Sequence, residues 1–224
     1  MKRRSPLGIP LKRNHLHRFS FRHLHFEQAN LLPRCRFCGN YGTKIGLLGA
    51  GMIGSRVIEL LRPYELDIMV FDPFMPEEKA AAMGVTKASL EEIFETCHII
   101  SNHLANRPET VGIIRRDLLA RMADDAVFIN TGRAAQVDMP ALIEEMQSHP
   151  NRLALLDVTD PEEPPREDSP LYQTENIFLT PHIAGSTGYE THRMADFMYE
   201  EYKRVSAGEA PEHAVSLAML ETMA

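Results

Sequence analysis

A glycine-rich turn lies between an apolar strand and an amphipathic helix near residue 50. Gly49, Gly51 and Gly54 form a G-x-G-x-x-G motif. Apolar residues over 44–48 predict a strand before the motif, and apolar residues at helical spacing predict a helix over 52–61 after it. The first glycine permits a tight turn, the second lets a pyrophosphate approach the backbone, and the third lets the helix pack closely on the strand. This strand-turn-helix context predicts a dinucleotide-binding turn.

Two further features would complete the dinucleotide site. The first turn of the helix, including Met52 and Ile53, offers unpaired N–H groups and a partial positive charge to the phosphates. Asp72 ends the next predicted strand, 18 residues after Gly54, where a carboxylate accepts hydrogen bonds from the adenosine ribose. Its charge would repel a 2′-phosphate, so the sequence favours NAD over NADP. Asp72 with Pro73 is also typical of a turn, and both interpretations can hold together.

From Lys44 onward, short apolar segments alternate with amphipathic ones. This alternation predicts a parallel sheet with crossover helices on both faces. We therefore expect the α/β fold class, a doubly wound parallel sheet (Rossmann fold), in a single main domain over 44–208. The predicted strands span 44–48, 67–71, 99–104, 126–130, 153–158 and 176–180. The predicted helices span 52–61, 90–97, 117–122, 141–148 and 188–207.

Local signals mark where several helices begin. Ser89 with Glu92 and Thr187 with Glu190 predict capping boxes, and Asp138 predicts a single cap. In the last predicted helix, apolar side chains recur at helical spacing, which is typical of packing in a core or an interface. These side chains are Met194, Phe197, Met198, Tyr202 and Val205.

Charge divides the chain into two unlike parts. Residues 1–44 carry ten basic residues and one acidic residue, a charge of +9. The other 180 residues carry 14 basic and 30 acidic residues, a charge of −16, so the whole chain has a net charge of −7. Residues 1–43 have no sustained period and several prolines and glycines, so they predict a poorly ordered basic arm without a folded role. A nucleic-acid-binding arm or a transit peptide is the less favoured alternative. Residues 209–224 are expected to form a C-terminal tail.

Three cysteines in 224 residues do not make a disulfide framework, which favours a reducing, cytoplasmic compartment. Cys35 and Cys38 form a C-x-x-C pair, but a closed zinc site usually has a second pair, so no metal is expected. No apolar run reaches the roughly 18 residues that a membrane-spanning helix needs. We therefore expect neither a membrane nor a nucleic acid as a partner.

Three polar segments follow predicted strands at the sheet edge where doubly wound folds bind ligands. They are 130–133 with Arg133, 156–162 with several carboxylates, and 180–185 with His182. A guanidinium can hold a substrate carboxylate through two hydrogen bonds, and an imidazole can take a hydroxyl proton as a hydride leaves. A carboxylate beside the imidazole would stabilise its protonated form. This set of groups has the chemistry for oxidising a hydroxy acid.

At these residues the chain resembles the D-isomer-specific 2-hydroxyacid dehydrogenases, over about 44–208. The resemblance rests on the glycine turn and on later stretches in family order. These are HLANRPET at 103–110, FINTGRAAQVDMPAL at 128–142, the segment 155–162 and TPHIAGST at 180–187. The resemblance implies an NAD-dependent oxidoreductase that acts on the CH–OH group of a D-2-hydroxy acid, or reduces the 2-keto acid, as a homodimer.

The resemblance also implies roles for individual residues. Arg133 would orient the substrate, Glu162 would pair with His182 as the general acid and base, and Asp157 would accept from the nicotinamide carboxamide. Taken singly, Arg133 could be a surface cation, His182 a strand-end histidine and Glu162 part of an exposed acidic loop. The implied cofactor contacts are Gly49, Gly51, Met52, Ile53, Gly54, Asp72, Leu104, Thr131, Gly132, Asp157 and His182.

Two departures from the family pattern bear on function. The family has Ala-Arg-Gly where this chain has Gly132-Arg133-Ala134, and an alanine rarely adopts the positive φ open to glycine. The family also places a substrate domain, on the order of 100 residues, before the dinucleotide-binding domain, whereas 43 residues precede Lys44. The alternative function is therefore a non-catalytic NAD-binding remnant or a redox sensor.

Overall fold

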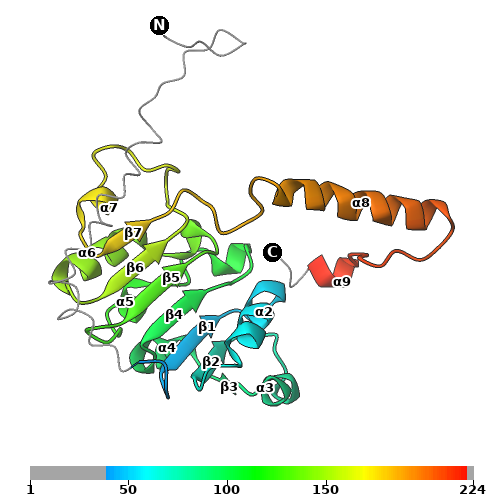
Figure 1. Cartoon of the computed structure of the whole chain (residues 1–224). Coiled ribbons are helices and arrows are strands. Elements are labelled where there is room, and N and C mark those ends of the chain that lie inside the picture. Colours follow the sequence, from blue (N-terminus) through cyan, green and yellow to red (C-terminus); the bar gives the residue numbers. More distant parts are fainter. Residues whose placement is uncertain (1–38, 221–224) are drawn as a thin grey trace, which may run out of the picture. The chain divides into compact units, whose positions relative to one another are not determined.

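Seven parallel strands form one sheet in the computed structural model, which describes residues 39–220 (Figure 1). The strand order is β3-β2-β1-β4-β5-β6-β7, so the chain changes direction across the sheet between β1 and β4. This order is that of doubly wound dinucleotide-binding sheets, which confirms the predicted fold class. The strands are β1 (Lys44–Leu48), β2 (Asp67–Phe71), β3 (Thr86–Lys87), β4 (Ile99–Asn102), β5 (Val127–Asn130), β6 (Leu153–Leu156) and β7 (Ile177–Leu179).

Helices connect the strands. The α-helices are α2 (Met52–Leu61), α3 (Glu77–Met83), α4 (Leu90–Thr96), α5 (Arg116–Leu119), α6 (Met139–Ser148), α7 (Pro170–Gln173), α8 (Glu190–Ser206) and α9 (Leu217–Leu220). Within residues 39–220, two short 3-10 helices are η2 (Pro108–Thr110) and η3 (Ala134–Gln136). The bounds of β1, β2 and α2 agree with the predicted ones. The elements α3, α7, α9 and β3 are not among the predicted ones, because segments of two to seven residues carry little periodic signal.

The structure confirms a side-chain cap at two of the three predicted helix starts, and at Ser89 this cap is the serine half of the predicted capping box. The side chains of Ser89 and Asp138 each accept a hydrogen bond of 3.1 Å from the N–H three residues later. The predicted Thr187 cap is wrong, because α8 begins after Tyr189. Thr187 instead supplies its main-chain carbonyl, which accepts from the N–H of Glu190 at 3.1 Å.

Apolar side chains pack on both faces of the sheet. One cluster joins β1 and β2 to α2, and includes Leu47, Ile58 and Val70. The larger cluster joins β4, β5 and β6 to α4, α5 and α6, with the rings of Phe94 and Phe128 6.3 Å apart. Burial of strand residues on both sides is the arrangement that parallel sheets require.

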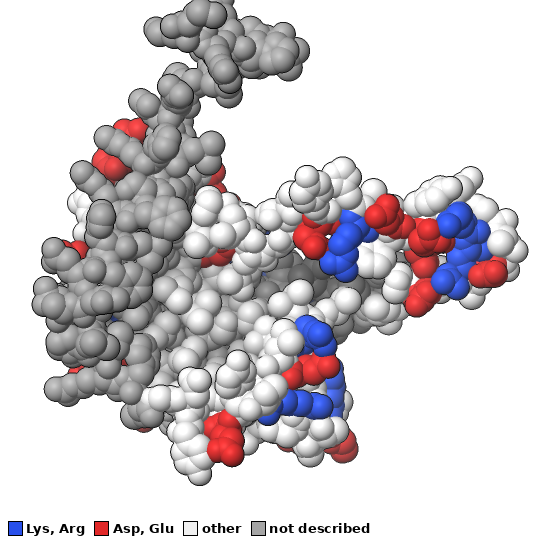
Figure 2. All heavy atoms as spheres, viewed as in Figure 1, with Lys and Arg blue, Asp and Glu red and all other residues white. Residues whose placement is uncertain are grey.

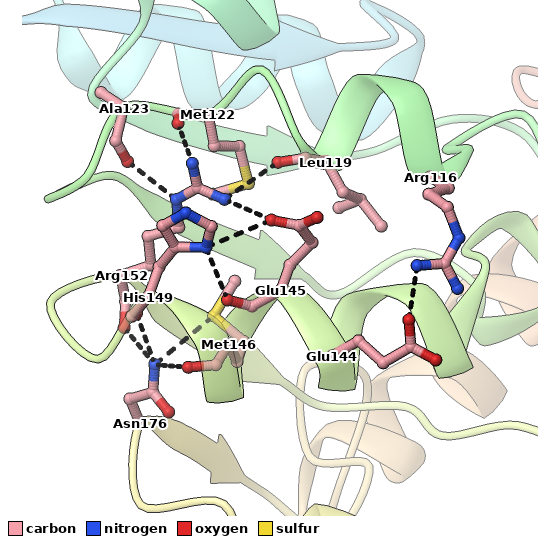
Figure 3. A network of polar contacts seen from close by, with 10 residues as sticks. All are labelled: Arg116, Leu119, Met122, Ala123, Glu144, Glu145, Met146, His149, Arg152 and Asn176. Carbon is pink, nitrogen blue, oxygen red and sulfur yellow. Dashed lines mark hydrogen bonds and ion pairs between the residues drawn. The ribbon is translucent and has the colours of Figure 1, made fainter.

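A buried arginine ties α6 to the chain at the end of α5 (Figure 3). The Arg152 side chain is 3% exposed, and its Nη1 lies 2.8 Å from Oε2 of Glu145. Its guanidinium also donates to three main-chain carbonyls, those of Leu119, Met122 and Ala123. One residue earlier on α6, Glu144 pairs with Arg116 at the surface. Asn176, just before β7, donates from Nδ2 to the carbonyl oxygen of Arg152 at 2.7 Å, so the network reaches the sheet edge.

The helix α8 exposes its apolar side chains. The five residues of its predicted stripe are 52–67% exposed, so the expectation of core packing is wrong in the described chain, while interface packing stays a prediction. Acidic and basic side chains alternate along the helix (Figure 2), including the pairs Glu190–Arg193 and Glu200–Lys203. Within residues 39–220, no helix is both long and apolar enough to cross a membrane.

Some predictions fall outside the described residues. They are most of the basic arm over 1–43, the Cys35–Cys38 pair and the end of the predicted tail at 221–224. The third cysteine, Cys97, follows α4 and is buried in the larger apolar cluster, and burial raises the pKa of its thiol to about 11. It therefore stays protonated at neutral pH.

Candidate cofactor and catalytic site

The glycine turn packs against the backbone that follows β4. Gly49 has a φ of +91°, and a Cβ there would lie 2.8 Å from the carbonyl oxygen of His103. A Cβ on Gly54 would lie 2.0 Å from the carbonyl oxygen of Gly49. A Cβ on Gly51, by contrast, would meet nothing within 4 Å. Packing therefore requires the first and third glycines, whereas the second leaves open space at the start of α2, as the approach of a pyrophosphate requires.

Asp72 joins the glycine turn to the loop after β2. Its Oδ2 accepts from the N–H of Ala50 at 2.8 Å, and its Oδ1 accepts from the N–H of Phe74 at 2.9 Å. The second bond closes the turn that the sequence predicts for Asp72 and Pro73. Each carboxylate oxygen retains a lone pair, so binding of ribose hydroxyls remains compatible with both bonds and stays a prediction.

Buried amide side chains connect the loops after β4 and β5. Asn102 Nδ2 donates to Oδ1 of Asn130 at 3.0 Å and to Oε1 of Gln136 at 2.7 Å. Gln136 Nε2 donates to the carbonyl oxygen of Leu104 at 3.2 Å, and the N–H of Gly132 donates to Oδ1 of Asn130 at 3.0 Å. The three amides are at most 1% exposed. The network holds Leu104 and Gly132, both predicted cofactor contacts, and none of its amides is a predicted site residue.

Arg133 follows directly on this network. Its N–H donates to Oε1 of Gln136 at 3.4 Å, and its Nη1 donates to the carbonyl oxygen of Gly132 at 2.9 Å. The side chain is exposed, so other guanidinium N–H groups face solvent. Ala134 begins η3 and is not among the residues with positive φ, so the departure from the family pattern causes no strain there.

Asp157 anchors the loop that carries His182. The N–H groups of Ile183 and Ala184 donate to its two carboxylate oxygens at 2.8 Å each, and the hydroxyl of Thr180 donates to Oδ1. Burial raises the pKa of Asp157, but these hydrogen bonds outweigh it and hold the pKa below its usual range. The structure thus gives Asp157 an anchoring role, and its contact with the nicotinamide stays a prediction.

His182 faces Glu163, not the predicted Glu162. Nδ1 of His182 lies 2.5 Å from Oε1 of Glu163. The main-chain oxygen of Glu162 accepts from the hydroxyl of Thr159 at 2.7 Å. Spacing cannot choose between adjacent glutamates in an irregular loop, because tertiary contacts set the path of its backbone. His182 has a φ of +52°, a strained conformation for a residue other than glycine, and its N–H donates to the carbonyl oxygen of Asp157 at 3.1 Å.

The three polar segments leave the same edge of the sheet. The strands β5, β6 and β7 are neighbours, and the N–H of Asp157 donates to the carbonyl oxygen of Asn130 at 3.0 Å. Asp157, at the end of β6, therefore lies between the segment of Arg133 after β5 and the segment of His182 after β7. In the described part of the chain, no hydrogen bond or ion pair joins Arg133 to His182 directly.

Known proteins are similar to this chain in sequence. A family model described as the NAD binding domain of D-isomer specific 2-hydroxyacid dehydrogenases matches residues 15–184, so the match begins within the predicted arm. The D-3-phosphoglycerate dehydrogenase of Methanocaldococcus jannaschii is 33% identical over 178 residues, which cover 79% of this chain and 34% of that protein. The chain thus spans about a third of the length of this curated relative.

Solved structures agree with the sequence comparison. The TT0316 protein from Thermus thermophilus has a TM-score of 0.67 and 31% identity, covering 79% of this chain and 55% of that one. D-lactate dehydrogenase with NAD⁺ from Lactobacillus jensenii has a TM-score of 0.66 and 26% identity, covering 78% and 56%. The chain therefore belongs to the D-isomer specific 2-hydroxyacid dehydrogenase family and carries its NAD-binding domain, with NAD as the cofactor.

Proposed function

We propose that this chain takes part in the NAD-dependent interconversion of a D-2-hydroxy acid and its 2-keto acid. The observation that carries the proposal is the pair of His182 and Glu163, 2.5 Å apart, in which Asp157 anchors the loop of His182 to the domain. Nδ1 of the imidazole faces the carboxylate, so Nε2 remains for a substrate hydroxyl. Bound NAD would supply the acceptor for the substrate's hydride.

The residues of this chain would divide the remaining work. In oxidation, Nε2 of His182 would take the hydroxyl proton while the hydride leaves carbon 2, and the reverse transfer would serve reduction. Glu163 would stabilise the imidazolium that forms. Arg133 would bind the substrate carboxylate through its exposed guanidinium and so orient carbon 2.

A binding titration followed by an activity assay tests the proposal. The purified chain is titrated with NADH, and then tested for reduction of glyoxylate, hydroxypyruvate and pyruvate. His182→Gln should bind NADH but lose turnover by at least about 100-fold, the usual contribution of general acid–base catalysis. His192→Gln, at an exposed histidine of α8, is the matched control and should keep both. Full activity in His182→Gln would refute the mechanism, and binding without turnover by the wild type would favour the NAD-binding remnant or redox sensor.

A second pair of variants separates the two glutamates. Glu163→Gln should lower turnover, because the imidazolium would lose its carboxylate partner. Glu162→Gln should leave turnover unchanged. The opposite result would make Glu162 the carboxylate that pairs with His182 and would mean that the loop rearranges when substrate binds.

Two wider expectations join the proposal. We propose a homodimer, to be tested by sedimentation equilibrium across a range of protein concentrations. We also propose a cytoplasmic location, to be tested by fractionating cells that produce the chain. A monomer at all concentrations, or recovery outside the cytoplasm, would contradict the respective expectation.

A further inference from the structure

Arg107 makes an unusual contact at the sheet edge near the glycine turn. It lies between β4 and η2, and its guanidinium carbon stands 5.1 Å from the centre of the Phe74 ring in the loop after β2. This distance is within the range of a cation–π contact. Because β1 lies between β2 and β4, the contact joins two loops that flank the glycine turn.

The Arg107 guanidinium has an unused donor. Its Nε lies 3.2 Å from Oε2 of Glu109, while its Nη1 is buried and has no hydrogen-bond partner among the described residues. Buried polar groups are nearly always paired, so an orphaned donor needs an explanation such as a bound ligand. The backbone beneath it is well fixed: the N–H of Arg107 donates to the hydroxyl of Thr110 at 3.2 Å, and the same hydroxyl accepts from Gln136.

A short chain of contacts connects Arg107 to the cofactor site. Its guanidinium covers Phe74, the N–H of Phe74 donates to Asp72, and Asp72 accepts from Ala50 in the glycine turn. An acidic residue at the position of Asp72 receives the adenosine ribose in this class of fold. The planar cation therefore stands beside the place where the adenine follows the ribose.

We propose that Arg107 binds the adenosine end of NAD, with its guanidinium stacked on the adenine and Nη1 donating a hydrogen bond to the nucleoside. This inference rests on NAD binding by this domain. A planar cation suits the role because it can lie flat on an aromatic ring and donate from its edge, whereas an ammonium cannot do both. The exposed Phe74 ring, 58% accessible, would keep the guanidinium in place before the cofactor arrives.

Calorimetric titration of the full chain with NADH and with ADP-ribose tests the inference. Arg107→Ala should weaken both ligands by the same factor, about tenfold, since ADP-ribose lacks only the nicotinamide. Arg107→Lys keeps the charge without the planar face and should also bind both more weakly than the wild type. Arg121→Ala is the control: Arg121 is exposed, pairs with Glu95 near the end of α4 and should leave both affinities unchanged.

Each outcome decides the matter. An Arg107→Ala chain that binds both ligands within twofold of the wild type would refute the inference. A loss of affinity for NADH alone would place Arg107 at the nicotinamide end of the cofactor. Wild-type affinity in Arg107→Lys would mean that Arg107 acts only through its charge, on a phosphate. Either result would overturn the adenine contact. A wild-type chain that binds neither ligand would instead refute NAD binding itself, which distinguishes the two failures.

Discussion

Replacing Arg152 by methionine should destabilise the domain strongly. The variant fills a similar volume but removes the cation that pairs with Glu145 and the donors for three main-chain carbonyls (Figure 3). Glu145 is only 15% exposed, so its charge would remain largely buried without its arginine, with only His149 Nδ1 beside it at 3.3 Å. Removing one member of a buried ion pair costs about 3–5 kcal/mol of unfolding free energy.

Arg116→Met is the matched control, because Arg116 pairs with Glu144, the residue next to Glu145 on α6. Both members of this pair are more than half exposed. Solvent screens such a pair, so its loss should change stability little. The two variants therefore remove the same side chain from neighbouring ion pairs that differ in burial.

Urea unfolding followed by circular dichroism measures both variants, since the chain has no tryptophan for fluorescence. The Arg152→Met midpoint should fall well below that of Arg116→Met. Adding Glu145→Leu to Arg152→Met should restore part of the lost stability, because the buried carboxylate that has lost its arginine would be gone. Equal midpoints for the two single variants, or a loss below about 1 kcal/mol for Arg152→Met against the 3–5 kcal/mol expected, would refute the role given to the buried network.

Three further predictions concern the cofactor and catalytic loops. Gly54→Ala should lower stability, because its Cβ would lie 2.0 Å from the Gly49 carbonyl oxygen, whereas Gly51→Ala should fold normally and lose NADH affinity; thermal melts and NADH titration compare the two. Gln136→Leu should cost about 1–3 kcal/mol in urea unfolding, because Asn102 and Leu104 would lose their partner in a buried network, and wild-type stability would contradict this. Asp157 has a folded pKa below its usual range, so its stabilisation is present above about pH 4 and is lost as the pH falls through the folded pKa. Asp157→Asn should thus be less stable than the wild type at pH 7 and differ less from it at pH 3. An equal difference in stability at both pH values would exclude this link between the Asp157 pKa and stability.

The architecture of the described chain follows closely from the sequence. The glycine motif and its flanking apolar segments predict β1 and α2 with their observed bounds, because a short continuous apolar run marks a strand buried on both faces and apolar residues at helical spacing mark a helix. Periodicity does not give the order of the strands across the sheet, but the alternation of strands and helices leaves few topologies open.

The candidate site divides differently. The neighbouring sequence is enough to predict Gly49, Gly54 and Asp72, since a sharp turn and a strand end are features of a few consecutive residues. The choice of Glu163 over Glu162 depends on how an irregular loop meets His182, 19 positions later. No pattern within the loop contains that information.

The sequence by itself determined that this chain forms a dinucleotide-binding sheet and which residue types gather at its edge. Only the tertiary structure decided how those residues are held. Asn102 and Gln136 are 34 positions apart, and the Arg107 guanidinium meets an aromatic ring from another loop. Such contacts depend on the sheet bringing distant loops together, whereas periodicity and turn chemistry report only on neighbours along the chain.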